Sequence, residues 1–321
     1  RLGRTMWFSP VRGLLPLGSP RIGTPYRGRR RRPLAIRLLT RIRALLALPL
    51  EGTEGITGGP MGCLRVVGTG MLTFVSSLTV VLRLHVVFRR IGGTVVVQRV
   101  DTGELVALAS YPTFDPNNIG DGKGVFSNLA FSDVFEPGST SKIMTVAAGL
   151  EEDTITPETP MILPGSVNRG NRTLNDSHPH PDEYRTVAGA LAQSSNTGTM
   201  LIGETMKPKT LEEYLRRFGL GSTSGSGFPG ESGGLLPKSE TWNGSQRYTI
   251  TYGQGVSTTA VQVTNVFQAI ANDGVRISPT FVKEVSDGEG GWEPAPAGKR
   301  NRAVSSKTAN QVSRMLEGVV S

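Results

Sequence analysis

A serine and a lysine three positions apart, Ser139 and Lys142, are the first residues of this sequence whose types and spacing predict chemistry. Residues at i and i+3 lie on one face of a helix. A neutral Lys142 amine would take the proton of the Ser139 hydroxyl and make it a nucleophile, which requires burial or a neighbouring cation to lower the lysine pKa. Taken alone, the pair is more typical of a helix cap, with Ser139 at the N-cap.

A second polar group, Ser194-Ser195-Asn196, follows 55 residues after Ser139. Residues at i and i+2 point the same way in an extended or turn conformation. Ser194 is therefore a candidate proton relay between Lys142 and a leaving group, and Asn196 a candidate ligand for a substrate amide. Taken alone, this group is again more typical of a capping turn between two helices.

The elements that must position these residues are short. A β-branched run at 94–100, a turn at 101–103 and a return run at 104–110 predict a hairpin. Apolar residues at helical spacing predict a buried helix from 139 to 150, and further helices are predicted at 186–193, 261–272 and 309–321. The Gly/Ser/Pro-rich stretch 219–237 predicts a long loop.

Several stretches together resemble the transpeptidase domain of class B penicillin-binding proteins. They stand in that family's order and are GELVALASYPTFDPN, FEPGSTSKIMTVAAGLEE, LAQSSNTG, FGLGSTSGSGFPGES and YGQGVSTTAVQVTNVFQAIANDGV. The Ser-x-x-Lys and Ser-x-Asn motifs are shared with serine β-lactamases and low-mass carboxypeptidases. The resemblance implies an α+β class, with the penicillin-binding transpeptidase and serine β-lactamase-like fold, over residues 91–321.

The resemblance also implies roles. Ser139 would be the acylated nucleophile, Lys142 the general base, Ser194 the proton relay and Asn196 a substrate-amide ligand. Residues 252–255, Tyr-Gly-Gln-Gly, resemble a structural element near the cleft. The implied reaction is peptidoglycan D,D-transpeptidation of a D-Ala-D-Ala stem pentapeptide, which β-lactams mimic, with no metal or cofactor. The parent protein would work with the cell-wall synthesis machinery, held in the cytoplasmic membrane with its catalytic domain outside.

The family's third motif, Lys-Thr-Gly or Lys-Ser-Gly, is absent from the sequence. Lys307-Thr308-Ala309 lacks the glycine and leads into a helical pattern. We therefore expect a truncated chain in which the last strands of the central antiparallel sheet are missing. Two alternatives follow: a catalytically incompetent fragment or non-catalytic homologue, and a D,D-carboxypeptidase or β-lactam sensor.

Residues 1–90 form a second region with a different composition. They hold 16 Arg, only two acidic residues and no Lys, Asp, Asn or Gln, whereas residues 91–321 hold more acidic than basic residues. We predict no stable fold for residues 1–90, whose composition resembles GC-rich DNA read in another frame. A membrane anchor at 66–82 and an Arg-rich arm at 27–32 are the alternatives. Nucleic acid is not expected as a partner.

Cysteine and histidine are too few to favour a metal centre or a disulfide framework. The sequence contains one Cys, Cys63, and three His. His178 and His180 lie in a Pro-rich stretch, where we interpret them as surface residues.

The missing motif generates a prediction for the 321-residue chain: it should form no lasting acyl-enzyme with a penicillin. The resemblance implies an oxyanion hole made of two backbone N–H groups. One belongs to Ser139, and the other lies on the strand just after the Lys-Thr-Gly motif. Loss of one such donor costs on the order of 3–4 kcal/mol of transition-state stabilisation. A fluorescent penicillin should label only an extended chain, meaning this sequence continued through the family's C-terminal strands. Ser139→Ala should abolish that signal, and stoichiometric labelling of the 321-residue chain would contradict the expectation.

Overall fold

The computed structural model describes residues 92–118, 125–286 and 288–319. The predictions made for residues 1–90, including the boundary at 90/91, the anchor and the arginine arm, lie outside these ranges. Within the described ranges, no helix has both the length and the apolar character needed to cross a membrane.

The predicted hairpin is present at the start of the described chain. Strands β1 (Gly93–Gln98) and β2 (Leu105–Tyr111) pair antiparallel, from Gly93 opposite Tyr111 to Gln98 opposite Leu105. The turn closes through Gly103, whose φ of +79° favours glycine and whose N–H donates to the Arg99 carbonyl at 3.0 Å. A Cβ at Gly103 would lie 2.9 Å from the Ser278 carbonyl oxygen, so the turn packs closely against the later chain.

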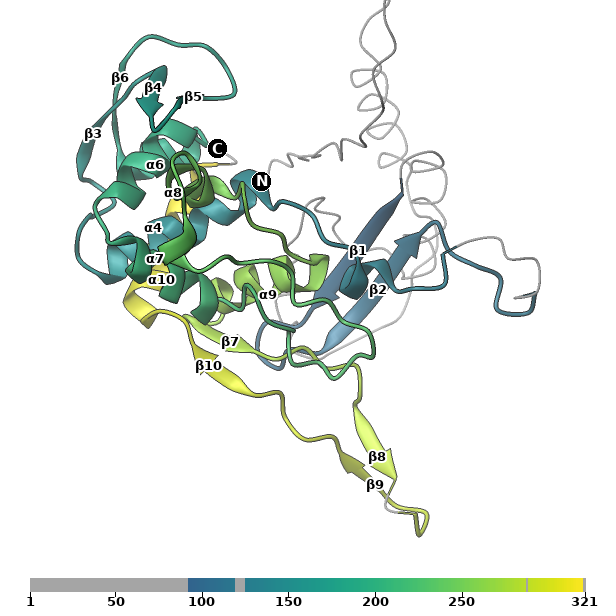
Figure 1. Ribbon diagram of the computed structural model, residues 1–321. Helices are drawn as coiled ribbons and strands as arrows, with labels where there is room; N and C mark the ends of the chain where they lie inside the picture. The colour runs from purple at the N-terminus through teal and green to yellow at the C-terminus, as the bar shows by residue number, and fades with distance from the viewer. Residues whose placement is uncertain (1–91, 119–124, 287, 320–321) are drawn as a thin grey trace, which may run out of the picture. The chain divides into compact units, whose positions relative to one another are not determined.

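Most of the helices gather on one side of the hairpin (Figure 1). They are α3 (Leu129–Ser132), α4 (Lys142–Glu151), α5 (Val187–Ala192), α6 (Asn196–Glu204), α7 (Pro208–Arg217), α8 (Gln246–Thr249), α9 (Ala260–Ala271) and α10 (Ser306–Glu317), with 3₁₀ turns η2 (Gly138–Ser141), η3 (Ser239–Thr241) and η4 (Ile250–Tyr252). Helix α9 lies between β1 and the other helices, and its Thr259 and Gln262 form a capping box.

The core has two clusters. The larger is built around α4, which is mostly apolar and is buried on every side from Lys142 to Leu150, as expected of a helix enclosed by others. The smaller joins the hairpin to α3 and α9 through Val96, Phe131 and Val261, and the Phe131 ring stacks on Phe228 at 4.3 Å between centroids. These contacts fix the hairpin against the helices.

Four further strand pairs are short, and the sequence patterns did not predict them. They are β3 (Pro160–Leu163) with β6 (Glu183–Thr186), β4 (Ser166–Arg169) with β5 (Arg172–Asn175), β7 (Val275–Ile277) with β10 (Arg300–Arg302), and β8 (Glu284–Ser286) with β9 (Trp292–Pro294). Helices and antiparallel strands together confirm the α+β class. Within the described ranges, β1 and β2 form a two-stranded sheet; the incompleteness of that sheet stays a prediction.

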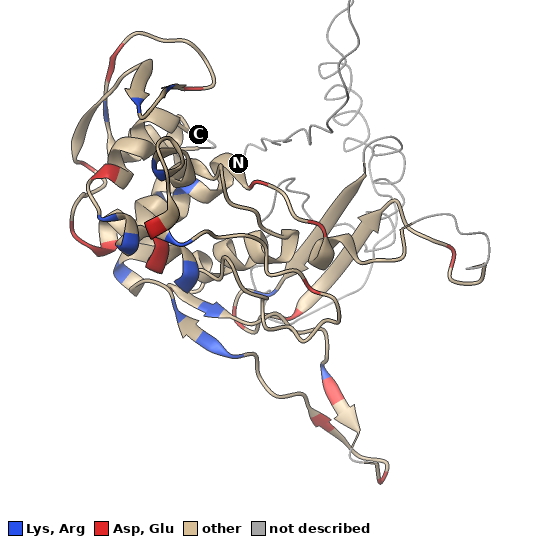
Figure 2. Cartoon of the chain, viewed as in Figure 1, with Lys and Arg blue, Asp and Glu red and all other residues tan. Residues whose placement is uncertain are grey.

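Charged residues of both signs are interspersed over the helical part (Figure 2). The β7–β10 pair itself contains three arginines, Arg276, Arg300 and Arg302. The Gly/Ser/Pro-rich stretch 219–237 is irregular, as predicted.

Lys307, Thr308 and Ala309 lie in the first turns of α10, which confirms that this stretch is helical and not a strand. Helix α10 begins three residues earlier than predicted because Ser305 caps it, accepting the Thr308 N–H at 3.2 Å. The Glu151 carboxylate at the end of α4 in turn accepts the Ser305 N–H at 3.0 Å and the Ser305 hydroxyl at 2.8 Å.

Glu151→Ala should lower the free energy of unfolding by about 1–3 kcal/mol, because it removes charge-assisted bonds to the N-terminus of α10. Partial burial raises the pKa of Glu151, but hydrogen bonds from Thr308 and Ser305 and the charge of Arg217 outweigh it and hold the pKa below its ordinary value. The contribution is therefore present above the ordinary glutamate pKa and is lost as pH falls through the folded-state pKa.

Urea denaturation at neutral and acidic pH measures both effects. Glu158→Ala serves as the control, since Glu158 is exposed. Equal midpoints for the Glu151→Ala and Glu158→Ala proteins at neutral pH would contradict the role assigned to Glu151.

Candidate active site

Ser139 lies in a tight 3₁₀ turn and not at the start of an α-helix. The turn η2 spans Gly138–Ser141, and α4 begins only at Lys142 with Ser141 as its N-cap. The helix predicted from residue 139 is therefore present, but its first turn is 3₁₀, and the alternative interpretation of Ser139 as the N-cap of that helix was wrong. Pro137 precedes the turn, and Gly138 has a φ of +54°. Together they favour a sharp reversal before the helix. The Ser139 side chain is exposed, and its hydroxyl makes no hydrogen bond within the described chain.

Lys142 is completely buried, with 0% relative exposure, at the first position of α4. Its Nζ donates to the backbone carbonyl of Ser194 and to the Ser194 Oγ, the latter at 3.2 Å. The structure thus brings Lys142 and Ser194 together across 52 residues. The Lys142 backbone N–H donates to the Ser139 carbonyl. Within the described ranges, no hydrogen bond joins the Lys142 amine to the Ser139 hydroxyl; catalytic bonds are often long before substrate binds.

Burial lowers the pKa of Lys142 to about 8, although the negative charge of Asp176 opposes the shift. An ammonium group loses its water shell when it is buried, which disfavours the charged form. With a pKa of about 8, roughly a tenth of the amine is neutral at pH 7, far more than for an exposed lysine. Lys142 therefore meets the electrostatic requirement for a general base.

Ser194 lies in the turn between α5 and α6, and Asn196 is the first residue of α6. Ser194 adopts a φ of +58°, a left-handed conformation that is uncommon outside glycine. Ser195 caps α6, and its Oγ accepts the Gly198 N–H at 2.8 Å. The Asn196 Nδ2 donates to the Asn175 carbonyl at 3.0 Å, so the amide nitrogen is engaged with the chain itself.

Residues 252–255 contact the chain at and just before the turn η2, which carries Ser139. The Gly138 N–H donates to the Gly253 carbonyl at 3.1 Å, and the Gly255 N–H donates to Glu136 Oε1 at 2.8 Å. A Cβ at Gly253, where φ is +84°, would lie 2.3 Å from the Gly138 carbonyl oxygen. Only glycine allows this approach, which explains the Tyr-Gly-Gln-Gly stretch physically.

One residue near Lys142 was missed. Asp176 follows β5, in the stretch interpreted from sequence as surface, and contacts the Ser194–Asn196 turn. Asp176 pairs with His180: the distance from His180 Nε2 to Asp176 Oδ2 is 3.1 Å. No motif in the sequence marked Asp176, because its contacts depend on how the 176–183 loop folds back. Within the described ranges, no three His, Cys, Asp or Glu side chains gather in a way that could hold a metal ion.

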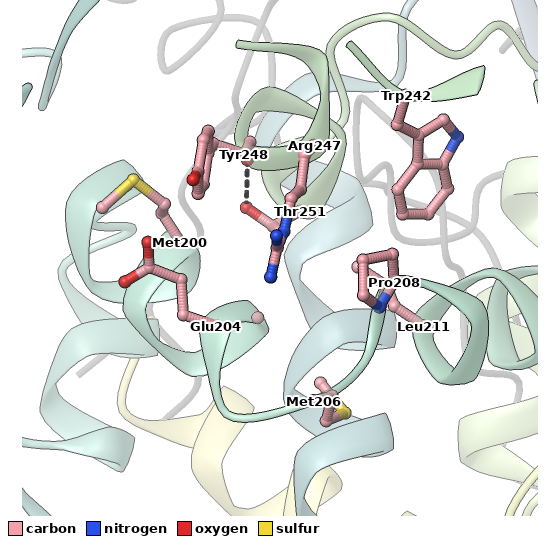
Figure 3. A pocket seen from close by; sticks show the side chains of 10 residues that line it. Met200, Glu204, Met206, Pro208, Leu211, Trp242, Arg247, Tyr248 and Thr251 are labelled. Atoms are coloured by element: carbon pink, nitrogen blue, oxygen red, sulfur yellow. Dashed lines mark hydrogen bonds between the residues drawn. The ribbon is translucent and has the colours of Figure 1, made fainter. Parts of the chain in front are cut away.

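A pocket among α6, α7, α8 and η4 contains none of the predicted site residues (Figure 3). It is lined by Met200, Gly203, Glu204, Met206, Pro208, Leu211, Trp242, Arg247, Tyr248 and Thr251. Thr251 donates from its hydroxyl to the Tyr248 carbonyl at 2.6 Å there. This pocket and the predicted site of Ser139, Lys142, Ser194 and Asn196 therefore share no lining residue.

Gly253→Ala should lower the free energy of unfolding by at least about 2 kcal/mol, because the added methyl group collides with the nucleophile turn in a conformation that favours glycine. Gly227→Ala is the matched control: Gly227 has a φ of +75°, but a methyl group there would meet no atom within 4 Å. Thermal unfolding of both variants measures the difference. Equal losses would show that the close approach to Gly138 costs nothing beyond the backbone conformation.

Comparisons with known proteins agree with the geometry. Residues 93–321 match the family described as "Penicillin binding protein transpeptidase domain". The chain is 40% identical over 221 residues to penicillin-binding protein PbpB of Mycobacterium tuberculosis, covering 68% of this chain and 32% of that protein. It is 34% identical over 194 residues to peptidoglycan D,D-transpeptidase FtsI of Escherichia coli, covering 57% of this chain and 31% of that protein.

Solved structures give the same picture. The crystal structure of penicillin-binding protein 3 from Mycobacterium tuberculosis complexed with aztreonam aligns with a TM-score of 0.72 and 37% identity, covering 75% of this chain and 54% of that chain. The chain spans about a third of the length of the PbpB relatives it matches. From residue 93 onward, this chain belongs to the penicillin-binding protein transpeptidase domain family.

Proposed function

We propose that this chain carries the acyl-transfer site of a peptidoglycan D,D-transpeptidase, with Ser139 as nucleophile. The observation that carries the proposal is the completely buried Lys142 amine, held 3.2 Å from the Ser194 hydroxyl and three residues beyond an exposed Ser139. The names of the relatives, D,D-transpeptidase FtsI and probable D,D-transpeptidase PenA, support the same reaction.

The proposed first step is attack of Ser139 Oγ on the carbonyl of the penultimate D-Ala of a stem pentapeptide. Neutral Lys142 accepts the hydroxyl proton as the new C–O bond forms. The Ser139 N–H, at the start of the turn leading into α4, is suited to the oxyanion. The C–N bond then breaks, and the terminal D-Ala leaves with a proton passed from Lys142 through Ser194.

The second step is attack of an amine from a neighbouring stem on the Ser139 ester, which restores the serine and forms the crosslink. Asn196 is proposed to bind the substrate amide through its Oδ1, since its Nδ2 already donates to Asn175. No metal or cofactor is proposed for either step.

β-Lactams are proposed to mimic the donor and acylate Ser139. Related structures are described as complexed with aztreonam and with ampicillin. We further propose that the parent protein is anchored in the cytoplasmic membrane, with this domain outside the cytoplasm and in contact with cell-wall synthesis proteins.

Acylation of the extended chain should accelerate as pH rises through about 8, because Lys142 then loses its proton. Lys142→Arg should slow acylation by roughly 10²–10⁴-fold, since arginine stays protonated. Stopped-flow measurement with a chromogenic cephalosporin between about pH 6 and 9.5, a range that brackets this pKa, gives both numbers. Lys209→Arg, on the exposed face of α7, is the control and should match the parent. A flat pH profile would refute Lys142 as the base.

The fate of the acyl group separates transpeptidase from carboxypeptidase. The extended chain should be given a thioester analogue of the stem donor together with a stem-derived amine, and the products separated by mass. A crosslinked product that disappears with Ser139→Ala is expected. Hydrolysed donor alone would favour the carboxypeptidase alternative, and reaction that survives Ser139→Ala would refute the nucleophile.

A further inference from the structure

Asp176 contacts the Ser194–Asn196 turn from a different part of the fold. It follows β5, in the group of short strands beside α6 (Figure 1), and its side chain is only 7% exposed. Its Oδ1 accepts the backbone N–H of Asn196 and, at 2.9 Å, the backbone N–H of Thr197. A carboxylate from one hairpin thus caps the first turn of α6.

This cap stabilises a turn whose backbone amides and left-handed residue need contacts from elsewhere in the fold. Ser195 satisfies the Gly198 N–H, so the amides of Asn196 and Thr197 need another acceptor, and Asp176 supplies it. The preceding residue, Ser194, has a φ of +58°, a conformation that persists only where surrounding contacts fix it. Asp176 on one side and Lys142 on the other provide such contacts.

Asp176 is itself held by His180. The His180 Nε2 lies 3.1 Å from Asp176 Oδ2, and the His180 Nδ1 lies 2.6 Å from the Pro181 carbonyl oxygen. Both ring nitrogens therefore face acceptor oxygens, an arrangement that the protonated imidazolium satisfies completely. The hydrogen bond to Pro181 and then that to Asp176 raise the pKa of His180.

Asp176 also acts on Lys142 by its charge. Partial burial raises the pKa of Asp176, but its hydrogen bonds from Ser195, Thr197, His180 and Asn196 outweigh this and lower it, so the group is ionised at neutral pH. The resulting negative charge opposes the effect of burial on Lys142. The other titratable or charged groups around this cluster are Glu183, Tyr252 and Arg172.

We propose that Asp176 is a positioning residue for acyl transfer: its carboxylate, held by His180, fixes the turn that carries Asn196 and keeps Ser194 against Lys142. The inference rests on the proposed function, because it assigns Asp176 a part in that same site. It predicts that Asp176 sets both the order of the turn and the protonation of Lys142, whereas a purely structural carboxylate would affect folding stability alone.

The test uses the 321-residue chain with ¹³C-labelled lysine and requires no turnover. The Lys142 resonance, assigned with the Lys142→Arg variant, is titrated by NMR, and hydrogen exchange is measured at the amides of Asn196 and Thr197. Three variants are compared: Asp176→Asn removes the charge, Asp176→Glu keeps the charge but moves it by one methylene, and Asp182→Asn neutralises an exposed carboxylate in the same loop.

Asp176→Asn should lower the titration midpoint of Lys142 and speed exchange of both amides by on the order of tenfold, as expected when a charge-assisted bond becomes a neutral one. Asp176→Glu should speed exchange while leaving the Lys142 midpoint closer to the parent value. Asp182→Asn should change neither. Parent-like values for either quantity in Asp176→Asn would overturn the proposal. If that variant does not fold, parent-like exchange in Asp176→Glu would overturn it.

Failure of this proposal is distinguishable from failure of the proposed function. Penicillin labelling of the extended chain that survives Ser139→Ala would refute the function, while the Lys142 titration would still decide the role of Asp176. Labelling that requires Ser139, together with a parent-like Lys142 midpoint in Asp176→Asn, would leave the function standing and refute the positioning role.

Discussion

The completely buried amine of Lys142 is the constraint on which the rest of the site depends. An ammonium group removed from water is costly unless it is hydrogen-bonded or gives up its proton. Here the fold supplies the Ser194 carbonyl and hydroxyl as acceptors, and burial lowers the lysine pKa to about 8. The same environment therefore hydrogen-bonds the charged amine and still leaves a fraction of it neutral, which a general base requires.

The surrounding elements can be understood as the means of keeping Lys142 there. Helix α4 is enclosed by other helices, so its first residue cannot reach solvent without disturbing the larger core cluster. The turn before it is fixed by the close approach of Gly253 to Gly138, which leaves Ser139 exposed. Ser139 lies in the 3₁₀ turn that precedes α4, and Lys142 is the first residue of α4. An accessible nucleophile is therefore followed three residues later by a buried base.

The sequence predicted the elements whose signals are local. The hairpin followed from a β-branched run and an Asp-Thr-Gly turn, and α9 from apolar spacing that ends at Asp273-Gly274. The start of α4 was misplaced because spacing alone does not distinguish a 3₁₀ turn from the first turn of an α-helix. Strands such as β4 and β5 have four residues and mixed polarity, too little for a periodic signal. The two motifs made Ser194 a candidate proton relay for Lys142, and the structure places these two residues in contact. Asp176 was missed because tertiary folding alone brings it to the turn.

The central claim is that burial makes Lys142 a base, and direct titration of its side chain in the 321-residue chain tests that claim. An NMR titration of the Lys142 Cε resonance should give a midpoint near 8, well below the ordinary lysine value of 10.5. A midpoint at or above 10.5 would show a lysine that stays protonated at neutral pH, and would contradict the account of how this site activates Ser139.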